Sequence, residues 1–164
     1  MDGLGHLFRS PLALHQDRPN QNMAREPIIE AGGLRVLPLL LRADKTPNVY
    51  AGAQMLYYIC RDQSGRDEVL KTSILYDLTD YVVLSSDELV CYAGIQTCAL
   101  LAPYKLDHPG FLDARFFDKV CTLAASGSNN SKLSCFNLMR ELSESLEMRE
   151  RFFMRPVSES RTSR

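Results

Sequence analysis

A repeated phrase constrains the fold of this chain more than any other feature of its sequence. YAGAQ occupies residues 50–54 and YAGIQ occupies residues 92–96, so the phrase recurs 42 positions later with one change. Self-similarity at a period of about 40 residues is typical of α-solenoids, in which each repeat is one packed unit of two or three helices. The repeat therefore predicts an all-α chain built from stacked helical units.

Both copies of the phrase lie in segments with the apolar spacing of α-helices. One stripe at i, i+4, i+7 and i+11 runs along each segment, as expected for a helix with one buried face. The stripe residues are Val49, Ala53, Leu56 and Cys60 in the first segment, and Cys91, Ile95, Cys98 and Ala102 in the second. We expect Thr46 to cap the first helix and either Ser86 or Asp87 to cap the second.

The segments that precede these two helices also correspond to each other, and a third copy follows. Apolar residues recur there at offsets of 41 or 42: Ile29, Leu34 and Leu37; Leu70, Leu75 and Leu78; Leu112, Phe117 and Val120. In the third long segment, Phe136, Met139 and Leu142 take the places of Ile95, Cys98 and Leu101. Three such repeats predict an α-solenoid, and the only β-prone run, YVVL at residues 81–84, is interpreted as a helix end.

Polar stretches containing proline, glycine or serine divide the chain. They predict loops at residues 42–48, 61–67, 84–88, 103–110 and 125–131. The expected organisation is an N-terminal segment at residues 1–23 that caps the stack or docks into a partner, a helical domain at residues 24–154, and a disordered tail at residues 155–164. Phe152 and Phe153 follow the third repeat with no further repeat to cover them, so we expect a partner subunit to contact them.

Composition excludes several classes of protein. The 19 Lys and Arg residues balance 20 Asp and Glu residues, which argues against nucleic-acid binding and binding to anionic membranes. The longest apolar run, residues 34–41, is much shorter than the ~20 residues that span a bilayer. Five cysteines without a CxxC pair fit buried, reduced thiols in a cytoplasmic protein. Arginines near the start make import into an organelle the alternative location.

No catalytic or cofactor-binding motif occurs in the sequence. The three histidines have no partners at metal-ligand spacing, and the chain contains neither a GxSxG elbow nor a phosphate-binding glycine loop. Two carboxylate pairs are assigned to solvated helix faces rather than to acid–base catalysis: Asp77 with Asp80, and Asp113 with Asp118. We therefore predict a protein without catalytic activity, cofactor or metal.

Residues 28–60, IIEAGGLRVLPLLLRADKTPNVYAGAQMLYYIC, resemble an armadillo repeat. The family pattern is a short apolar helix ending in alanine and glycine, a leucine-rich helix and a long helix containing alanine. Ala31, Gly32 and Gly33 carry much of the likeness, because glycine permits a sharp turn between two short helices. The resemblance covers about residues 24–153 and is strongest in the first unit. HEAT repeats are the alternative.

The armadillo resemblance implies a right-handed superhelix whose last helix in each repeat lines a concave groove for an extended peptide or a partner helix. Well-known members, the nuclear import adaptors and the catenins, carry a tryptophan and an asparagine on that helix. In this chain Gln54 and Gln96 stand at the tryptophan position, and Tyr58 and Leu100 stand at the asparagine position. These departures argue against recognition of basic nuclear signals.

The residues of the long helices indicate a different use of such a groove. Gln54, Gln96 and Asn137 provide one side-chain amide per repeat, and an amide can both donate to and accept from the backbone of an extended peptide. Tyrosines beside them would add contact area of the kind that interfaces favour: Tyr50, Tyr57, Tyr58 and Tyr92. The alternative is that these amides lie on a solvated helix face.

Two functions follow from this interpretation. The first is an armadillo-like adaptor or scaffold that binds a protein segment in its groove. The second is a constitutive structural subunit of a larger multiprotein assembly. Both predict protein partners and membership of a complex or homo-oligomer, without nucleic acid and without membrane insertion.

Overall fold

The computed structural model describes residues 25–154 of the 164-residue chain, and these residues form helices and no strands. The all-α prediction is confirmed for this part. The N-terminal segment (1–23) and the tail (155–164), whose roles were predicted from sequence, lie outside the described residues.

The helices fall into three consecutive groups, which we call layers. Layer one contains α2 (Arg25–Glu30), α3 (Gly33–Leu41) and α4 (Thr46–Cys60). Layer two contains α5 (Gln63–Leu70), α6 (Ile74–Asp77), its π-helical continuation η2 (Leu78–Val82) and α7 (Glu88–Leu101). The 3₁₀ turn η3 (Ala102–Tyr104) leads to layer three, which contains α8 (Pro109–Leu112), α9 (Ala114–Ser126) and α10 (Asn129–Leu142). Helix α11 (Leu146–Met154) follows.

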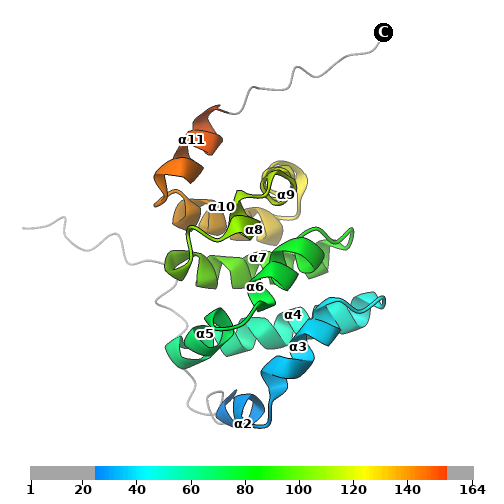
Figure 1. The fold of residues 1–164 in the computed structure, drawn as a ribbon. Helices are drawn as coiled ribbons and strands as arrows, with labels where there is room; N and C mark the ends of the chain where they lie inside the picture. The colour runs from blue at the N-terminus through cyan, green and yellow to red at the C-terminus, as the bar shows by residue number, and fades with distance from the viewer. Residues whose placement is uncertain (1–24, 155–164) are drawn as a thin grey trace, which may run out of the picture.

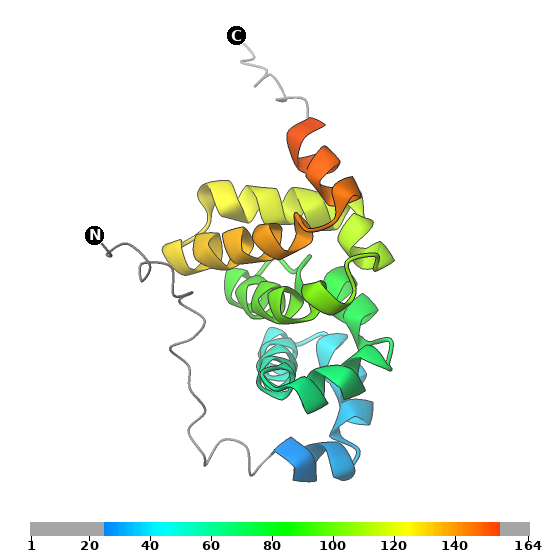
Figure 2. The same ribbon diagram turned by 90° about the vertical axis from the view of Figure 1, so that its left-hand side faces the viewer.

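The three layers are stacked in chain order, from α2 at one end to α11 at the other (Figure 1). The long helix of each layer packs against the long helix of the next, α4 against α7 and α7 against α10. Figure 2 shows these long helices following one another along one side of the molecule, with the short helices of the first two layers on the other side. The apolar core runs through all three layers.

A glycine separates α2 from α3. Gly32 has φ 80°, in the left-handed region that residues with a Cβ rarely adopt. Its neighbour Gly33 lies so close to α2 that a Cβ there would sit 2.6 Å from the carbonyl oxygen of Ile28. The Ala-Gly-Gly sequence therefore permits the sharp turn that was predicted between the two short helices.

The predicted helix caps were right for α7 and wrong for α4. Asp87 caps α7 by accepting hydrogen bonds from the backbone N–H groups of Leu89 (2.9 Å) and Val90 (3.1 Å). Thr46 is instead the first residue of α4, which follows Lys45 without a side-chain cap. Because proline is favoured in the first turn of a helix, Pro47 supplies the start signal here.

Helix α5 lies in a stretch that the sequence predicted to be a loop. Asp62 caps it by accepting a hydrogen bond from the backbone N–H of Gly65 at 2.8 Å. Gly65 is buried, and a Cβ there would lie 1.9 Å from the carbonyl oxygen of Ile59 at the end of α4. The glycine that suggested a loop is thus required by the close approach of α5 to α4.

Layer two contains one residue more than its neighbours between its second and third helices. Leu37 and Tyr50 are 13 positions apart, and so are Val120 and Leu133, whereas Leu78 and Tyr92 are 14 apart. The π-helical turn lies in this interval, and the backbone N–H of Val83 donates to the carbonyl of Leu78 at 3.0 Å. A π-turn closes over five residues rather than four and so has room for an additional residue inside a helix, and the connection at residues 83–87 is also one residue longer than its counterpart at residues 42–45.

Polar contacts link the second helices of successive layers. Arg42, at the end of α3, donates from Nε to Oδ1 of Asp77 at 2.8 Å. At the next junction, Lys119 of α9 donates from Nζ to the carbonyl oxygen of Ser85 at 2.8 Å. Asp77 is only 1% exposed, so its assignment to a solvated face was wrong. Its carboxylate forms part of the junction between layers one and two.

Hydrogen bonds also join the N-termini of the long helices of layers two and three. Oε1 of Glu88 accepts hydrogen bonds from the backbone N–H of Ser128 (2.8 Å) and the hydroxyl of Ser131 (2.7 Å). These bonds, the one from the Ser128 backbone above all, lower the pKa of Glu88 because they stabilise its ionised form.

The five cysteines all lie within the described residues and form no disulfide there. Burial raises the pKa of Cys60 to about 12, and it also raises the pKa of Cys98 and of Cys91. Cys121 is half-buried. The prediction that Cys91 and Cys98 contribute to core packing is confirmed by their burial.

Among residues 25–154, no helix combines the length and the hydropathy needed to span a membrane.

We predict that Gly65→Ala destabilises the protein. Overpacking against the backbone of Ile59 costs ~1–3 kcal/mol, and the gain in helix propensity is about 1 kcal/mol, so we expect a net loss of up to about 2 kcal/mol in unfolding free energy. Urea titration followed by circular dichroism measures this loss. The neighbouring exposed Ser64→Ala serves as the control and should change stability by less than about 0.5 kcal/mol. Equal stability of the two variants would contradict the close approach.

We also predict selective thiol reactivity. At pH 8 a thiol with a pKa of about 12, such as that of Cys60, is ionised to about one part in ten thousand. Cys121 should therefore react first with iodoacetamide in the folded protein, as peptide mass spectrometry would show. Modification of Cys60 or Cys98 before Cys121 would contradict the observed burial. The unfolded protein, as the control, should show no such order.

Candidate functional site

The long helices present equivalent side chains in rows across the three layers. One row is Gln54 of α4, Gln96 of α7 and Asn137 of α10, and all three side chains are half-buried. Gln96 and Asn137 line one hollow, and Gln54 occupies the equivalent position on α4. Their partial burial distinguishes them from residues of a fully solvated helix face.

A hollow of about 110 Å³ lies on this face where the three long helices meet. It contains two of the predicted amides, Gln96 and Asn137, together with the predicted Tyr57. Its remaining lining residues are Ala99, Leu100, Ser134, Arg140 and Glu141. The hollow thus has apolar walls and several hydrogen-bonding groups, a combination common in binding sites.

Each glutamine is held by the tyrosine one turn before it. The amide nitrogen of Gln96 donates to the hydroxyl oxygen of Tyr92 at 2.9 Å, and that of Gln54 donates to the hydroxyl oxygen of Tyr50 at 3.2 Å. Within residues 25–154, the amide oxygens of both glutamines and the amide of Asn137 have no hydrogen-bond partner. The amides are therefore oriented and still able to bind a ligand.

Aromatic and charged groups border the row of amides. Tyr50 and Tyr58 are exposed on α4, and the rings of Tyr57 and Tyr58 meet edge to face with centroids 5.7 Å apart. On α10, Arg140 donates from Nε to Oε1 of Glu141 at 3.1 Å, which places an ion pair at the layer-three end of the face.

Sequence reasoning identified only part of the hollow. Ala99 and Arg140 were missed, although they stand at the position of Tyr57 in the next two layers and the repeat offsets predict them. Phe152 and Phe153 lie in α11 and not in a long helix, so the structure does not place them in these rows. Their side chains lie outside the described residues.

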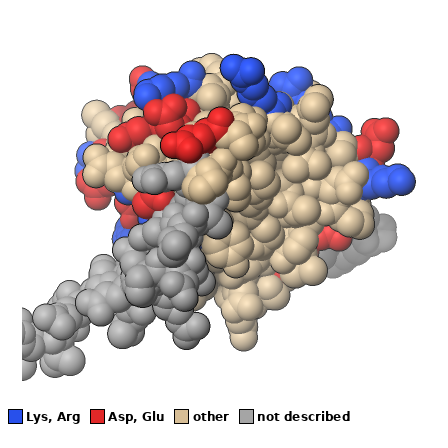
Figure 3. Space-filling model, turned by 90° about the horizontal axis from the view of Figure 1, so that it is seen from below, with Lys and Arg blue, Asp and Glu red and all other residues tan. Residues whose placement is uncertain are grey.

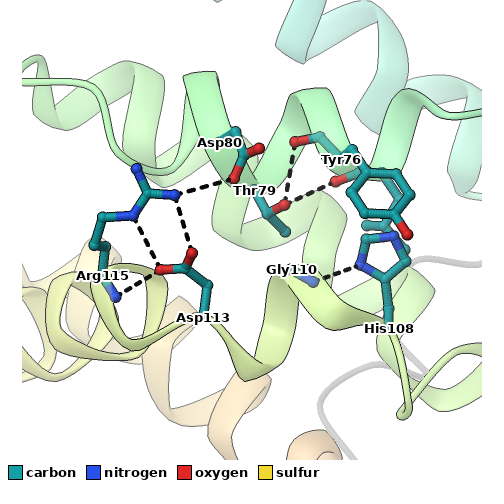
Figure 4. A network of polar contacts seen from close by, with 8 residues as sticks. Tyr76, Thr79, Asp80, His108, Gly110, Asp113 and Arg115 are labelled. Carbon is teal, nitrogen blue, oxygen red and sulfur yellow. Dashed lines mark hydrogen bonds and ion pairs between the residues drawn. The ribbon is translucent and has the colours of Figure 1, made fainter.

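A second hollow, of about 260 Å³, lies on the junction of layers two and three and contains a histidine. The ring of His108 contacts that of Tyr76 with centroids 4.2 Å apart and planes tilted by 55°, and its Nδ1 accepts a hydrogen bond from the backbone N–H of Gly110 at 3.1 Å (Figure 4). Burial above all lowers the pKa of His108, while nearby Asp107 opposes this shift. His108 therefore caps α8 as a neutral ring.

An ion-pair network on the same junction joins one carboxylate from each of the two predicted pairs, Asp113 and Asp80. Asp113 caps α9 by accepting a hydrogen bond from the backbone N–H of Arg115 at 2.7 Å, and the Arg115 guanidinium also reaches Asp80 of layer two at 3.8 Å (Figure 4). The hydrogen bond from the Arg115 side chain lowers the pKa of Asp113 to about 2. Asp113 has a capping role that accounts for its position.

In the part of the chain that the structure describes, no three His, Cys, Asp or Glu side chains gather into a group able to hold a metal ion. Comparisons of this chain with protein-family models, curated proteins and solved structures produced no match.

We predict that protonation of His108 weakens the fold. The pKa of His108 in the folded protein lies below its ordinary value of 6.5, so the unfolded chain binds more protons as pH falls. The contribution of His108 is then fully present above pH 6.5 and is lost as the pH falls towards the folded pKa. Urea midpoints at pH 7.5 and pH 5.0 measure the difference in stability.

His108→Asn is the matched variant for this experiment, because asparagine keeps a capping acceptor and does not titrate. The variant should lose less stability than the wild type between the two pH values. An equal loss in both proteins would show that other groups cause the pH dependence.

Proposed function

We propose that this chain is a non-catalytic, armadillo-like adaptor or scaffold that binds an extended segment of a partner protein across α4, α7 and α10. The observation that carries the proposal is the row of Gln54, Gln96 and Asn137, with two of these amides in one hollow. The order of short, intermediate and long helices in layer one is consistent with an armadillo-like unit.

Hydrogen-bonding groups favour an extended ligand. A peptide in extended conformation presents N–H and C=O groups along its whole length, and side-chain amides can donate to the one and accept from the other. Because Tyr92 already accepts a hydrogen bond from the amide nitrogen of Gln96, the amide oxygen of Gln96 is oriented as an acceptor for a ligand N–H. One amide per layer then supplies contacts at regular intervals.

The hollow and the tyrosines suggest what such a segment contains. Apolar wall atoms from Ala99 and Leu100 suit one small apolar side chain, and the exposed rings of Tyr50 and Tyr58 suit further apolar or aromatic contact. Arg140 and Glu141 neutralise each other, so the face selects no strongly charged segment. A mixed, weakly charged peptide fits this face best.

The second candidate is a constitutive subunit of a larger assembly, and one observation favours it. Phe136 on α10 is exposed, although its apolar equivalents in α4 and α7 are buried. Purification from cells at high salt distinguishes the two functions. A stoichiometric complex that survives the salt supports the subunit, and exchangeable partners at lower occupancy support the adaptor.

We predict that groove variants lose peptide binding without losing stability. Peptides selected from a random phage-display library on the wild-type protein should bind the double variant Gln96→Ala, Asn137→Ala about fivefold more weakly or worse, because two hydrogen bonds worth ~0.5–1.5 kcal/mol each are removed. Fluorescence anisotropy measures the affinities. Thermal unfolding should change little, since both side chains are partly exposed.

Thr122→Ala is the matched control, because Thr122 is an exposed polar residue on α9 rather than on a long helix of the groove. Peptides should bind this variant like the wild type. Equal affinity for the double variant and the control would mean that the amides lie on a merely solvated face.

A further inference from the structure

Equivalent positions on the three long helices differ in burial according to the layer that follows them. Ala53 of α4 and Ile95 of α7 are both 0% exposed, whereas Phe136 of α10 is 58% exposed. Each of α4 and α7 is followed by another layer: the long helix α7 packs on α4, and the long helix α10 packs on α7. Among the described residues only α11 follows α10, and Phe136 is exposed although Met148 of α11 is buried. We call this uncovered surface of α10 the rear face.

The opposite side of the long helices shows the converse pattern. Ala93 of α7 and Ser134 of α10 are buried, and each belongs to a helix with a preceding layer. Their equivalent in α4 is Ala51, which is exposed. Asn48 of α4 is exposed in the same way, whereas its equivalent Val90 is buried. We call this uncovered surface of layer one the front face.

The second helices extend the front face. Asp77 and Lys119 occupy equivalent positions in layers two and three. Each forms a hydrogen bond to the preceding layer, Asp77 with Arg42 and Lys119 with the carbonyl of Ser85. The equivalent position in layer one is Val36, which is 49% exposed and carries no charge. Figure 3 views the molecule from this end and shows a continuous uncharged surface with charged side chains at its margin. An uncharged, partly apolar surface of this kind is typical of an interface.

We infer that copies of this chain associate end to end, with the rear face of one copy packed on the front face of the next. Inside the chain, long helix packs on long helix at both layer junctions. The positions equivalent to the rear face are buried on the two helices that another layer follows, and those equivalent to the front face are buried on the two helices that another layer precedes. A second copy therefore offers Phe136 a surface of the kind that already covers Ile95.

Such an interface is heterologous, because two different surfaces meet. A pair of copies retains one free front face and one free rear face, one on each copy, so association continues into a ring or an open chain. The inference does not depend on the proposed peptide groove, since Phe136, Val36 and Ala51 lie outside the hollow.

Complementary variants of the full chain test this inference. Phe136→Asp places a charge on the rear face, and Ala51→Arg places a charge and a bulky group on the front face. Both residues are exposed, so circular dichroism should show both variants folded. Sedimentation velocity should show the mass of the wild type rising with concentration beyond that of a dimer. Each variant alone should remain monomeric, because truncation or charging of a central contact weakens association by about tenfold or more.

A mixture of the two variants separates end-to-end association from other arrangements. Phe136→Asp keeps an intact front face and Ala51→Arg keeps an intact rear face, so the mixture should form a heterodimer and nothing larger. Ser64→Asp, which adds a charge to an exposed site in layer two, should assemble like the wild type. A wild-type chain that stays monomeric at all concentrations would overturn the inference. This holds also where the reason is that its own residues 1–23 cover the front face. A mixture that stays monomeric would overturn it too.

Discussion

The long helices α4 and α7 are each buried on one side by the long helix of the next layer, and the rest of the structure depends on these two contacts. Ala53 and Ile95 lose all contact with solvent because another layer follows them. No layer can bury its own apolar surface alone, so the layers stabilise one another in series. The polar contacts of Asp77 and Lys119 fix the register of a stack whose stability comes from apolar burial.

The sequence was sufficient to predict the long helices and the alignment of their side chains. The repeated phrase at residues 50–54 and 92–96 has helical periodicity, and a helix that recurs at a fixed offset presents the same side chains on the same face. For this reason the amides of Gln96 and Asn137 could be placed together before any contact was known. The third copy was found from its apolar positions alone, because Phe136 replaces Ile95 without change of spacing.

The short elements could not be predicted in the same way, because tertiary contacts decide them. Helix α5 has a sequence typical of a loop, and it is helical because Asp62 caps it and Gly65 allows its approach to α4. Asp77 resembles a surface carboxylate in sequence, and its burial depends on Arg42, which lies 35 positions away. The burial of Met148 in α11 could not be predicted either, since no local sequence pattern indicates which surface α11 packs against.

The π-helical turn at Leu78–Val82 bears on how a chain of this architecture changes in length over evolution. An insertion within an ordinary α-helix rotates every later side chain by about 100° and would turn the apolar face of that helix away from the core. A π-turn confines an added residue to one widened turn, and the connection at residues 83–87 separates the second helix from α7, so Tyr92 and Gln96 still stand level with Tyr50 and Gln54. Repeats of unequal length can therefore preserve a common surface, and divergence in spacing need not mean divergence in the surface that a ligand meets.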